Sequence, residues 1–454
     1  MVWKKLKAVF LQDAPPSNAL PELEYSWDIR KSISRVKAHR WSIADLPYAI
    51  MAISFTFCFF VIQNPPFLAR LAIALLLLFA CLIPITSQFF FNALPIFCWL
   101  VLFYTCQFIP HTWRPRIYVR VLPALETILY GGNLSEILSS KTNAVLDLLA
   151  WFPYGLAHFG APFVVAAILF VFAPPKTLPV YAFAFGWMNF IGVAIQLCFP
   201  TAPPWYQLIH GLEPANYTMP GSPGGLARID QLLGLNMYTG TFTASPMVFG
   251  AFPSLHSGCA TMEALFLSYL LPKYTPLFYA YVMWIWWSTM YLTHHYFVDL
   301  IGGAVLSFIV FYCVKRTMLP HIQGDKFARW SYDYIETGPP AHQLKVRKSL
   351  DFELPLYNLE DPKSSSESDP QRILAPIDTS FNKSLHHSHH KTSSYHLYDS
   401  DVYATSASST PVNLHHPSSP LAQPPSSASS VKSISRPNST VPDEKPKLSS
   451  VHRD

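Results

Sequence analysis

Apolar residues gather into long runs between residues 46 and 316, separated by short polar stretches. A helix needs about 20 apolar residues to cross the hydrocarbon layer of a membrane, with a range of about 17–25. The first and fourth runs are short and the second and third nearly touch, so six or seven spans remain alternatives to eight. The runs predict spans at Leu46–Val61, Phe67–Thr86, Phe89–Ile109, Ala157–Phe172, Pro179–Phe199, Leu255–Leu271, Pro276–Thr293 and Phe297–Val314.

Two prolines and one amphipathic stretch add detail to this pattern. Pro84 and Pro95 are expected to kink their helices, because proline removes a backbone hydrogen bond inside a helix. Leu122–Leu138 reads as a helix lying at the membrane interface rather than as a span. The predicted fold is an all-α integral membrane protein with about eight transmembrane helices.

Charged residues are scarce in the same region, with 17 among the 271 residues from Leu46 to Arg316. The whole chain is 13% charged, against about 25% in soluble proteins. Each charge buried in lipid costs several kcal/mol unless it is paired or hydrated, so much of this region belongs in a membrane. The net charge of +5 forms no basic stripe with interleaved aromatics, which argues against nucleic-acid binding.

The two ends of the chain differ in composition from the apolar region. Residues 1–45 are mixed polar and basic with no apolar core of a signal peptide, and they predict a cytosolic arm. Residues 46–318 form the predicted transmembrane catalytic domain. Residues 319–454 form a predicted cytosolic tail rich in Ser, Pro and His, and we expect it to be disordered and dispensable for chemistry beyond about Leu350.

Basic residues in the flanks predict the orientation. The N-terminal arm is rich in Lys and Arg, and the last span ends in Lys315 and Arg316, so both termini read as cytosolic. That requires an even number of spans. The loop Pro110–Leu156 then falls on the lumenal side although it carries four cations, so either the count fails there or those cations have a local task. The four are Arg114, Arg116, Arg120 and Lys141.

Three polar motifs interrupt the apolar background at the same predicted face of the membrane. They are Cys198–Tyr206, where the fifth span ends, Phe252–Gly258, where the sixth begins, and Thr293–Asp299, between the seventh and eighth. Their convergence, across about 100 residues of chain, predicts a shared lumenal site.

The third motif holds a histidine and a carboxylate at helical spacing. His295 and Asp299 are four residues apart, which places both side chains on one face of a helix. Asp299 can then accept one ring N–H and leave the other ring nitrogen with a lone pair, as in nucleophilic catalysis. The alternative is a His–Asp hydrogen bond that only orders a helix start. His294 is the rival nucleophile, but it has no carboxylate four residues on.

The second motif supplies another histidine. Ser254 is a plausible N-cap, which places His256 in the first turn of a helix, where free N–H groups attract phosphate. Ser257 and Gly258 would let an anion approach the backbone. A second histidine provides the acid and base that a two-step phosphoryl transfer needs. The alternative is a capped helix with an incidental histidine.

These motifs resemble those of a known family. Pro253–Gly258 (PSLHSG) and His295–Asp299 (HYFVD) are similar to the two histidine motifs of the type 2 phosphatidic acid phosphatase (PAP2) superfamily, in its sphingolipid-synthase branch. Phe199–Tyr206 (FPTAPPWY) and Leu146–Phe159 (LDLLAWFPYGLAHF) resemble the catalytic subunit of fungal inositol phosphorylceramide synthases. The resemblance covers residues 147–316.

The resemblance implies a six-helix PAP2-like catalytic core and a function. The chain would move inositol phosphate from phosphatidylinositol to ceramide, release diacylglycerol, act in the Golgi membrane with a small regulatory subunit, and be a target of aureobasidin. His295 would be the nucleophile, Asp299 its orienting group and His256 the acid and base. No cofactor is implied. We expect no metal either, since the three side chains are all assigned to acid, base and nucleophile.

The chain departs from the wider superfamily in the groups that meet phosphate charge. The superfamily has an arginine six residues before the nucleophile, where this chain has Thr289, and its Lys- and Arg-bearing first motif is not evident. That departure favours a phosphodiester over a more highly charged phosphomonoester. Further candidates for substrate binding are His294, Ser257, Gly258, Asp147, His158, Arg228, Tyr206 and Glu263.

Two other functions compete with a lipid phosphotransferase. A lipid phosphate phosphatase would use the same phosphohistidine step with water as acceptor, and the motifs do not separate the two. A transporter is the more distant alternative. Against it, the polar groups gather at one face and the chain shows no internal repeat.

Overall fold

The structure, a computed structural model, describes residues 24–338, which lie within one compact unit. The predicted disordered tail beyond about Leu350 and the start of the N-terminal arm lie outside the described residues. Within residues 24–338 the secondary structure is helical, with isolated bridges and no strand. The all-α prediction is therefore confirmed for this part of the chain.

Each of the eight predicted spans corresponds to a helix. Within the described residues, five helical stretches are long and apolar enough to cross a membrane: Ile43–Val61, Pro84–Phe108, Ala144–Phe172, Thr177–Cys198 and Phe297–Thr317. Three further helices of the bundle, α4, α14 and α15, have 16, 16 and 17 residues. The eight are α3 (Leu46–Val61), α4 (Phe67–Leu82), α5 (Pro84–Thr105), α9 (His158–Phe172), α10 (Thr177–Cys198), α14 (Leu255–Leu270), α15 (Thr275–Tyr291) and α16 (Phe297–Thr317).

Pro84 separates two helices instead of kinking one. It occupies the first turn of α5, and α4 ends before it at Leu82. Proline fits the first turn because the N–H that it lacks has no partner there. The predicted kink at Pro84 is therefore wrong, while Pro95 does lie inside α5.

The fourth span begins earlier than predicted. Helix α8 (Ala144–Trp151) continues through a π-helical turn, η4 (Phe152–Ala157), into α9. The side chain of Asn143 caps this run by accepting the N–H of Leu146 at 2.9 Å. The predicted start at Ala157 therefore falls inside a continuous helical stretch. Its π-helical turn is of a kind often found at functional sites.

The interfacial stretch predicted at Leu122–Leu138 is two helices. Helix α6 (Val121–Tyr130) ends at Gly131, whose φ of +78° suits glycine, and the side chain of Asn133 caps α7 (Leu134–Ser139). A residue in the left-handed region commonly ends a helix, and a polar cap starts the next. The prediction of one continuous helix there is wrong.

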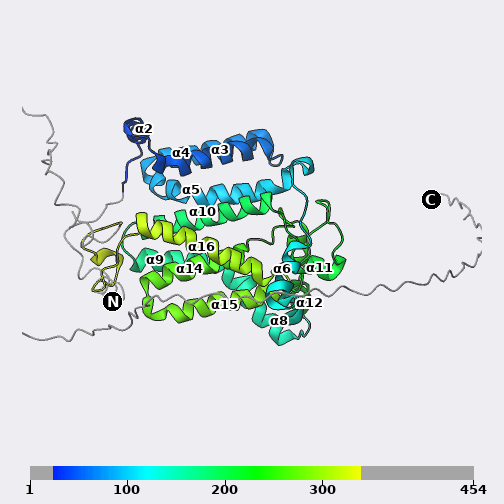
Figure 1. Cartoon of the computed structure of the whole chain (residues 1–454). Coiled ribbons are helices and arrows are strands. Elements are labelled where there is room, and N and C mark those ends of the chain that lie inside the picture. The colour runs from blue at the N-terminus through cyan, green and yellow to red at the C-terminus, as the bar shows by residue number, and fades with distance from the viewer. Residues whose placement is uncertain (1–23, 339–454) are drawn as a thin grey trace, which may run out of the picture. The chain divides into compact units, whose positions relative to one another are not determined.

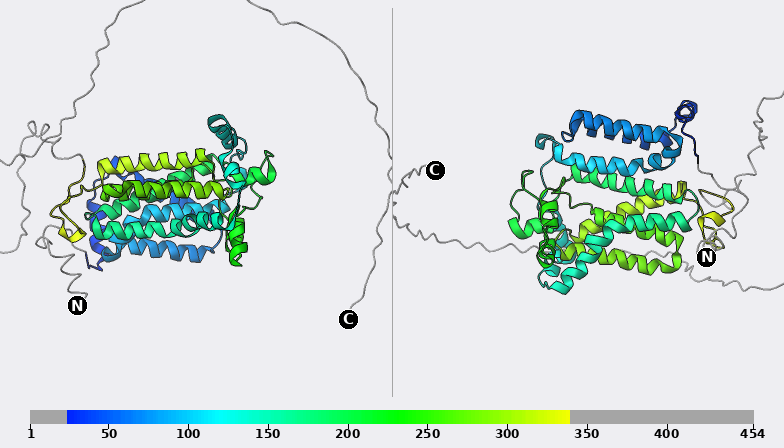
Figure 2. Two further views of the ribbon diagram at one scale, coloured as in Figure 1. Left: turned by 90° about the horizontal axis from the view of Figure 1, so that it is seen from below. Right: turned by 180° about the vertical axis from the view of Figure 1, so that it is seen from behind.

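The long helices form a layered bundle with short helices at one end (Figure 1). Helix α5 packs against α10, and α14 packs against α9, α15 and α16. The end of the bundle opposite α2 (Ile29–Ala38) carries α6, α8, α11 (Pro204–His210) and α12 (Leu226–Leu233), and Figure 2 shows the same grouping from two other sides. Helix α13 (Met237–Thr243) packs on α12.

Candidate functional site

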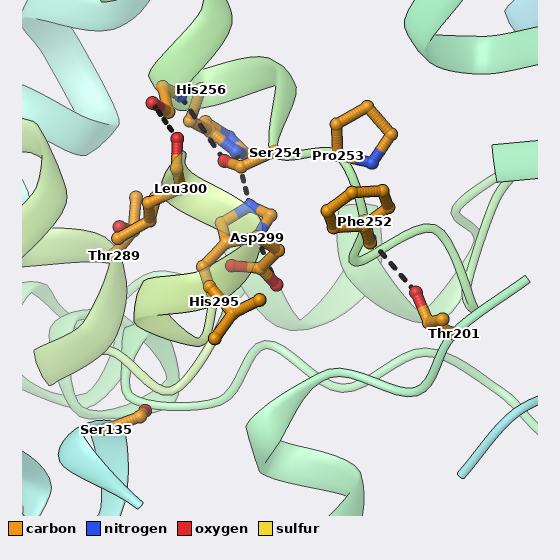
Figure 3. A network of polar contacts seen from close by, with 12 residues as sticks. Ser135, Thr201, Phe252, Pro253, Ser254, His256, Thr289, His295, Asp299 and Leu300 are labelled. Atoms are coloured by element: carbon orange, nitrogen blue, oxygen red, sulfur yellow. Dashed lines mark hydrogen bonds and ion pairs between the residues drawn. The ribbon is translucent and has the colours of Figure 1, made fainter. Parts of the chain in front are cut away.

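Three polar side chains from two different helix starts meet at the end of the bundle that carries the short helices (Figure 3). His256 Nδ1 lies 2.9 Å from His295 Nε2, and His295 Nδ1 lies 3.3 Å from Asp299 Oδ2. If Asp299 accepts the Nδ1–H of His295, then Nε2 of His295 carries the lone pair and accepts the N–H of His256. The structure thus brings together the three residues that the sequence singled out.

Hydrogen bonds to backbone groups fix the starts of α14 and α16 relative to each other. Ser254 caps α14 by accepting the N–H of Ser257 at 3.3 Å, which places His256 in the first turn. The Ser254 N–H donates to the carbonyl of Asp299 at 2.9 Å, and the Ser257 hydroxyl donates to the carbonyl of Leu300 at 2.6 Å. The position of His256 is therefore tied directly to α16.

The first motif, Cys198–Tyr206, forms hydrogen bonds with the segment that carries the second motif. Thr201 Oγ1 accepts the N–H of Phe252 at 3.0 Å, and the Thr201 carbonyl accepts the N–H of Ala251 at 3.3 Å. These bonds fix the segment that leads into α14 (Figure 3). Thr201 of the motif Cys198–Tyr206 thus holds the second motif in place, and Pro203 and Trp205 of the same motif line the cavity described below.

A buried glutamate, which the sequence reasoning passed over, caps the helix that carries Asp299. Glu126 of α6 is fully buried, and its two carboxylate oxygens accept the N–H groups of Phe297 and Val298 at 3.2 and 3.3 Å. Burial raises the pKa of Glu126 above its usual range. The available signal was an acidic residue inside the apolar run 121–130.

A cavity of about 370 Å³ opens beside the two histidines. Its wall includes Tyr154, His158, His256, His294 and His295, together with apolar side chains from α5, α9 and the loop before α14. Among the described residues that line it, none is Lys, Arg, Asp or Glu. Asp299 lies behind His295 rather than at the cavity wall.

The histidines of the α15–α16 turn are buried and neutral. Burial lowers the pKa of His295 to about 3, and burial lowers that of His294 to about 3 as well. Burial has this effect because removing water disfavours the charged ring. A neutral ring keeps the lone pair that nucleophilic attack requires.

The comparisons with known proteins cover the part of the chain that carries this site. A family model described as the PAP2 superfamily matches residues 122–313, a range that includes all three of these side chains. The inositol phosphorylceramide synthase of Candida albicans is 53% identical over 373 residues, which cover 81% of this chain and 79% of that protein. The inositol phosphorylceramide synthase catalytic subunit AUR1 of Saccharomyces cerevisiae is 51% identical over 77% of this chain and 88% of its own length.

The chain belongs to the inositol phosphorylceramide synthase family. A bacterial relative, the phosphoinositol dihydroceramide synthase of Bacteroides thetaiotaomicron, is 30% identical over 41% of this chain and 65% of that protein. No solved structure matches the chain.

The position where the wider superfamily has an arginine has a structural task in this family member. Thr289 is fully buried, and its hydroxyl donates to the carbonyl of Trp286 at 2.9 Å. Its carbonyl accepts the N–H groups of His294 and His295 at 2.9 and 3.3 Å. Thr289 therefore shapes the turn that presents both histidines and brings no charge to the cavity.

Two of the further candidates for substrate binding line the cavity. His158 has a ring centroid 4.7 Å from that of His256, and its Nδ1 is buried with no partner among the described residues. His294 donates from Nε2 to the carbonyl of Pro223 at 3.0 Å, and its ring stacks on Tyr154. His294 is thus held by a carbonyl rather than a carboxylate.

Asp147 and Arg228 form an ion pair away from the cavity wall. Arg228 donates from Nε to Asp147 Oδ1 at 2.9 Å, and Nη2 lies 2.8 Å from the same oxygen. The hydroxyl of Tyr291 donates to this oxygen at 2.9 Å. The pair connects α12 with α8, and the guanidinium is engaged there rather than at the histidines.

Four other candidates also lie outside the residues that line the cavity. Ser257 is committed to Leu300, and a Cβ at Gly258 would lie 2.7 Å from the sulfur of Met188, so glycine there permits close helix packing. The hydroxyl of Tyr206 donates to the carbonyl of Glu213 at 3.2 Å. Glu263 lies two turns deeper in α14, where its carboxylate has no partner among the described residues.

Two of the cations that contradicted the predicted orientation, Arg114 and Arg116, have local partners. Arg114 donates to the carbonyls of Cys106 and, at 3.1 Å, Ile109 at the end of the α5 span, and its guanidinium lies over the ring of Tyr217. Arg116 lies over the ring of Tyr118. These two arginines therefore have a local task in the loop, as the second of the two sequence-based alternatives requires.

Tyr154 is the cavity residue that the sequence reasoning missed. It is 3% exposed, it projects from the π-helical turn, and its ring lies between those of His256 and His294 at centroid distances of 4.7 and 5.3 Å. Its hydroxyl has no partner among the described residues. The signal was present in the matching stretch AWFPYG, but a tyrosine in an apolar run does not by itself indicate a site.

Metal binding has no candidate among residues 24–338. No group of three or more His, Cys, Asp or Glu side chains in that range is arranged to hold a metal ion. The three polar side chains of the site instead form a linear series, in which His256 contacts His295 and His295 contacts Asp299.

Proposed function

We propose that this chain is a phosphotransferase that moves inositol phosphate from phosphatidylinositol to ceramide and releases diacylglycerol. The observation that carries the proposal is the buried series His256–His295–Asp299 at a cavity, in a chain half identical to proteins named inositol phosphorylceramide synthase. The reaction has two steps, transfer of inositol phosphate to His295 and then to ceramide, and the same three side chains perform both.

In the first step, Nε2 of His295 attacks the phosphorus of phosphatidylinositol. The N–P bond forms, the bond from phosphorus to the diacylglycerol oxygen breaks, and protonated His256 donates a proton to that oxygen. The phosphoryl group then lies between the two rings and replaces the hydrogen bond of 2.9 Å that joins His256 Nδ1 and His295 Nε2. Asp299, behind Nδ1, stabilises the positive charge that develops on His295.

In the second step, ceramide enters after diacylglycerol has left. Its primary hydroxyl gives its proton to His256, and the oxygen attacks phosphorus as the N–P bond breaks. His295 returns to its neutral form and His256 is again protonated, so the proton balance closes over the cycle. The largely apolar wall of the cavity limits hydrolysis of the phosphohistidine by water between the steps.

The uncharged wall of the cavity supports a phosphodiester substrate. A phosphodiester carries one negative charge, whereas a phosphomonoester carries up to two near neutral pH. The described cavity wall offers hydrogen-bond donors such as Tyr154 and His158 but no Lys or Arg. Neutral donors suit the smaller charge, and this favours the transferase over a lipid phosphate phosphatase.

Location and partners are part of the same proposal. The site faces the lumen of the Golgi, both termini are cytosolic, and a small regulatory membrane subunit accompanies the chain. Lys315 and Arg316 at the end of α16 support this orientation, because they lie a full helix away from Asp299 at its start. Inhibition by aureobasidin is a further expectation.

The test is the product formed by purified protein in detergent from phosphatidylinositol labelled in the inositol ring. With ceramide present, we expect labelled inositol phosphorylceramide, and none with His295→Ala. Release of labelled inositol phosphate at the same rate with or without ceramide would instead show that water is the acceptor, and the transferase proposal would fail.

Orientation has its own test in sealed Golgi vesicles, with exposed Cys198 and Cys313 replaced by serine. A membrane-impermeant thiol reagent should label Lys176→Cys but not Ser140→Cys, because these exposed positions belong to opposite faces. Labelling of Ser140→Cys would reverse the assignment.

A further inference from the structure

One residue of the cavity wall also belongs to the outer surface of the bundle. Phe159 lines the cavity beside the histidines, yet it is 66% exposed. It lies in a helical run, Ala144–Phe172, that is apolar and long enough to cross a membrane. An exposed aromatic ring on such a helix faces lipid, so the cavity reaches the bilayer at this point.

The opposite side of this opening is formed by another span. Trp99 and Phe103 of α5 line the same cavity. Their neighbours Leu100 and Tyr104 are exposed, so this flank faces lipid as well. Both α5 and α9 pack against α10, which contributes Gln196 to the cavity.

The cavity wall combines apolar and polar side chains. Near α5 and α9 its wall is aromatic, whereas the segment from Gly221 to Ser245 adds Ser222, Thr241 and Ser245. The histidines lie in the same wall. A wall of this mixed composition suits a lipid molecule, which has apolar chains and a polar headgroup.

We propose that α5 and α9 frame a lateral entrance through which the chains of the substrate lipids extend into the bilayer while the reacting group sits at His256 and His295. Phe159 contacts these chains and acts as a specificity residue for their length. The inference rests on the proposed function for the identity of the lipids. Both ceramide and diacylglycerol then exchange sideways, without passing their chains through water.

The first test compares acceptors of different chain length. Phe159→Ala is matched by Phe163→Ala, a phenylalanine one turn further along α9 that is 77% exposed and is not among the residues that line the cavity. We expect Phe159→Ala to change the ratio of kcat/KM for long-chain over hexanoyl ceramide by about 10-fold, as a pocket contact with a few methylenes does. Phe163→Ala should leave the ratio at its wild-type value. An unchanged ratio in Phe159→Ala, or an equal change in Phe163→Ala, would overturn the proposal.

The second test needs no turnover and therefore separates this inference from the proposed function. Phosphatidylinositol with a diazirine in its acyl chain is photolysed with the full chain in detergent, and the cross-linked residues are mapped by mass spectrometry. Cross-links near Phe159 and Phe103 should be removed by excess unlabelled phosphatidylinositol, whereas those near Phe163 should persist as general lipid contact. Equal persistence at all three positions would refute a lateral entrance even if the enzyme is active.

Discussion

A single methyl group added to α16 should disable the site without touching any reacting side chain. Gly303 lies one turn after Asp299, where α16 crosses the start of α14. A Cβ at this position would lie 2.0 Å from the carbonyl oxygen of Ser254 and 3.1 Å from the backbone nitrogen of Gly258. These are backbone atoms, so no change of rotamer relieves the clash.

The size of the displacement follows from these distances. Ordinary van der Waals contact begins at 3.4 Å, so the two helix starts must separate by about 1.4 Å in Gly303→Ala. That motion carries His256 away from His295. In the wild-type protein, Nδ1 of His256 lies 2.9 Å from Nε2 of His295. A misplacement of about 1 Å can lower a rate about 100-fold, and overpacking a core costs about 1–3 kcal/mol.

The assay is initial-rate transfer of labelled inositol phosphate to ceramide, together with thermal unfolding in detergent. We expect Gly303→Ala to retain helical content, lose a few degrees in Tm and fall about 100-fold in kcat. Gly324→Ala is the control, because a Cβ there meets no atom within 4 Å. Wild-type turnover in Gly303→Ala would refute the argument that this backbone contact sets the geometry of the site.

The remaining predictions concern individual side chains. His295→Ala should abolish a covalent phosphoprotein trapped from phosphate-labelled phosphatidylinositol, whereas His294→Ala should still form it; the reverse pattern would move the nucleophile to His294. Tyr154→Phe keeps the ring between its two histidine neighbours but removes a donor, so kcat should fall about 100-fold; Tyr181→Phe, equally buried at 3% exposure but outside the cavity wall, should show wild-type kcat, and equal losses would point to general destabilisation. Glu126→Ala leaves two buried N–H groups without an acceptor and should destabilise the protein by about 1–3 kcal/mol, measured as a lower Tm; an unchanged Tm would mean that water replaces the carboxylate. Because burial lowers the pKa of His295 to about 3, its neutral form persists as pH falls, so kcat/KM should not decrease between pH 7 and pH 5, and an acid limb centred near 6.5 would contradict this.

The apolar pattern of the sequence determined where the helices of this protein lie. Each predicted span corresponds to a helix, because an apolar segment in a membrane must satisfy its backbone hydrogen bonds within itself. The spacing of His295 and Asp299 was equally local, since i and i+4 positions share a helix face wherever the helix is placed. The convergence of the motifs also followed from the alternation of spans across the membrane.

Local rules failed where a helix end depended on a few residues. Pro84 reads as a kink in an apolar run, yet it begins a new helix, and Gly131 divides what looked like one interfacial helix. Nothing in the apolar periodicity distinguishes these outcomes, because a break and a bend leave the same pattern of side chains.

Only the tertiary structure decided which polar residues face the cavity. Ser257 and Gly258 looked suited to an anion, but α16 packs against them and uses them for helix contact. Glu126 and Tyr154 lie far from the third motif in the sequence and reach it because α6 and η4 pack around the start of α16 and the histidine turn. Such contacts depend on where whole helices lie relative to one another, and that arrangement arises from packing across the bundle, which a single segment of sequence does not encode.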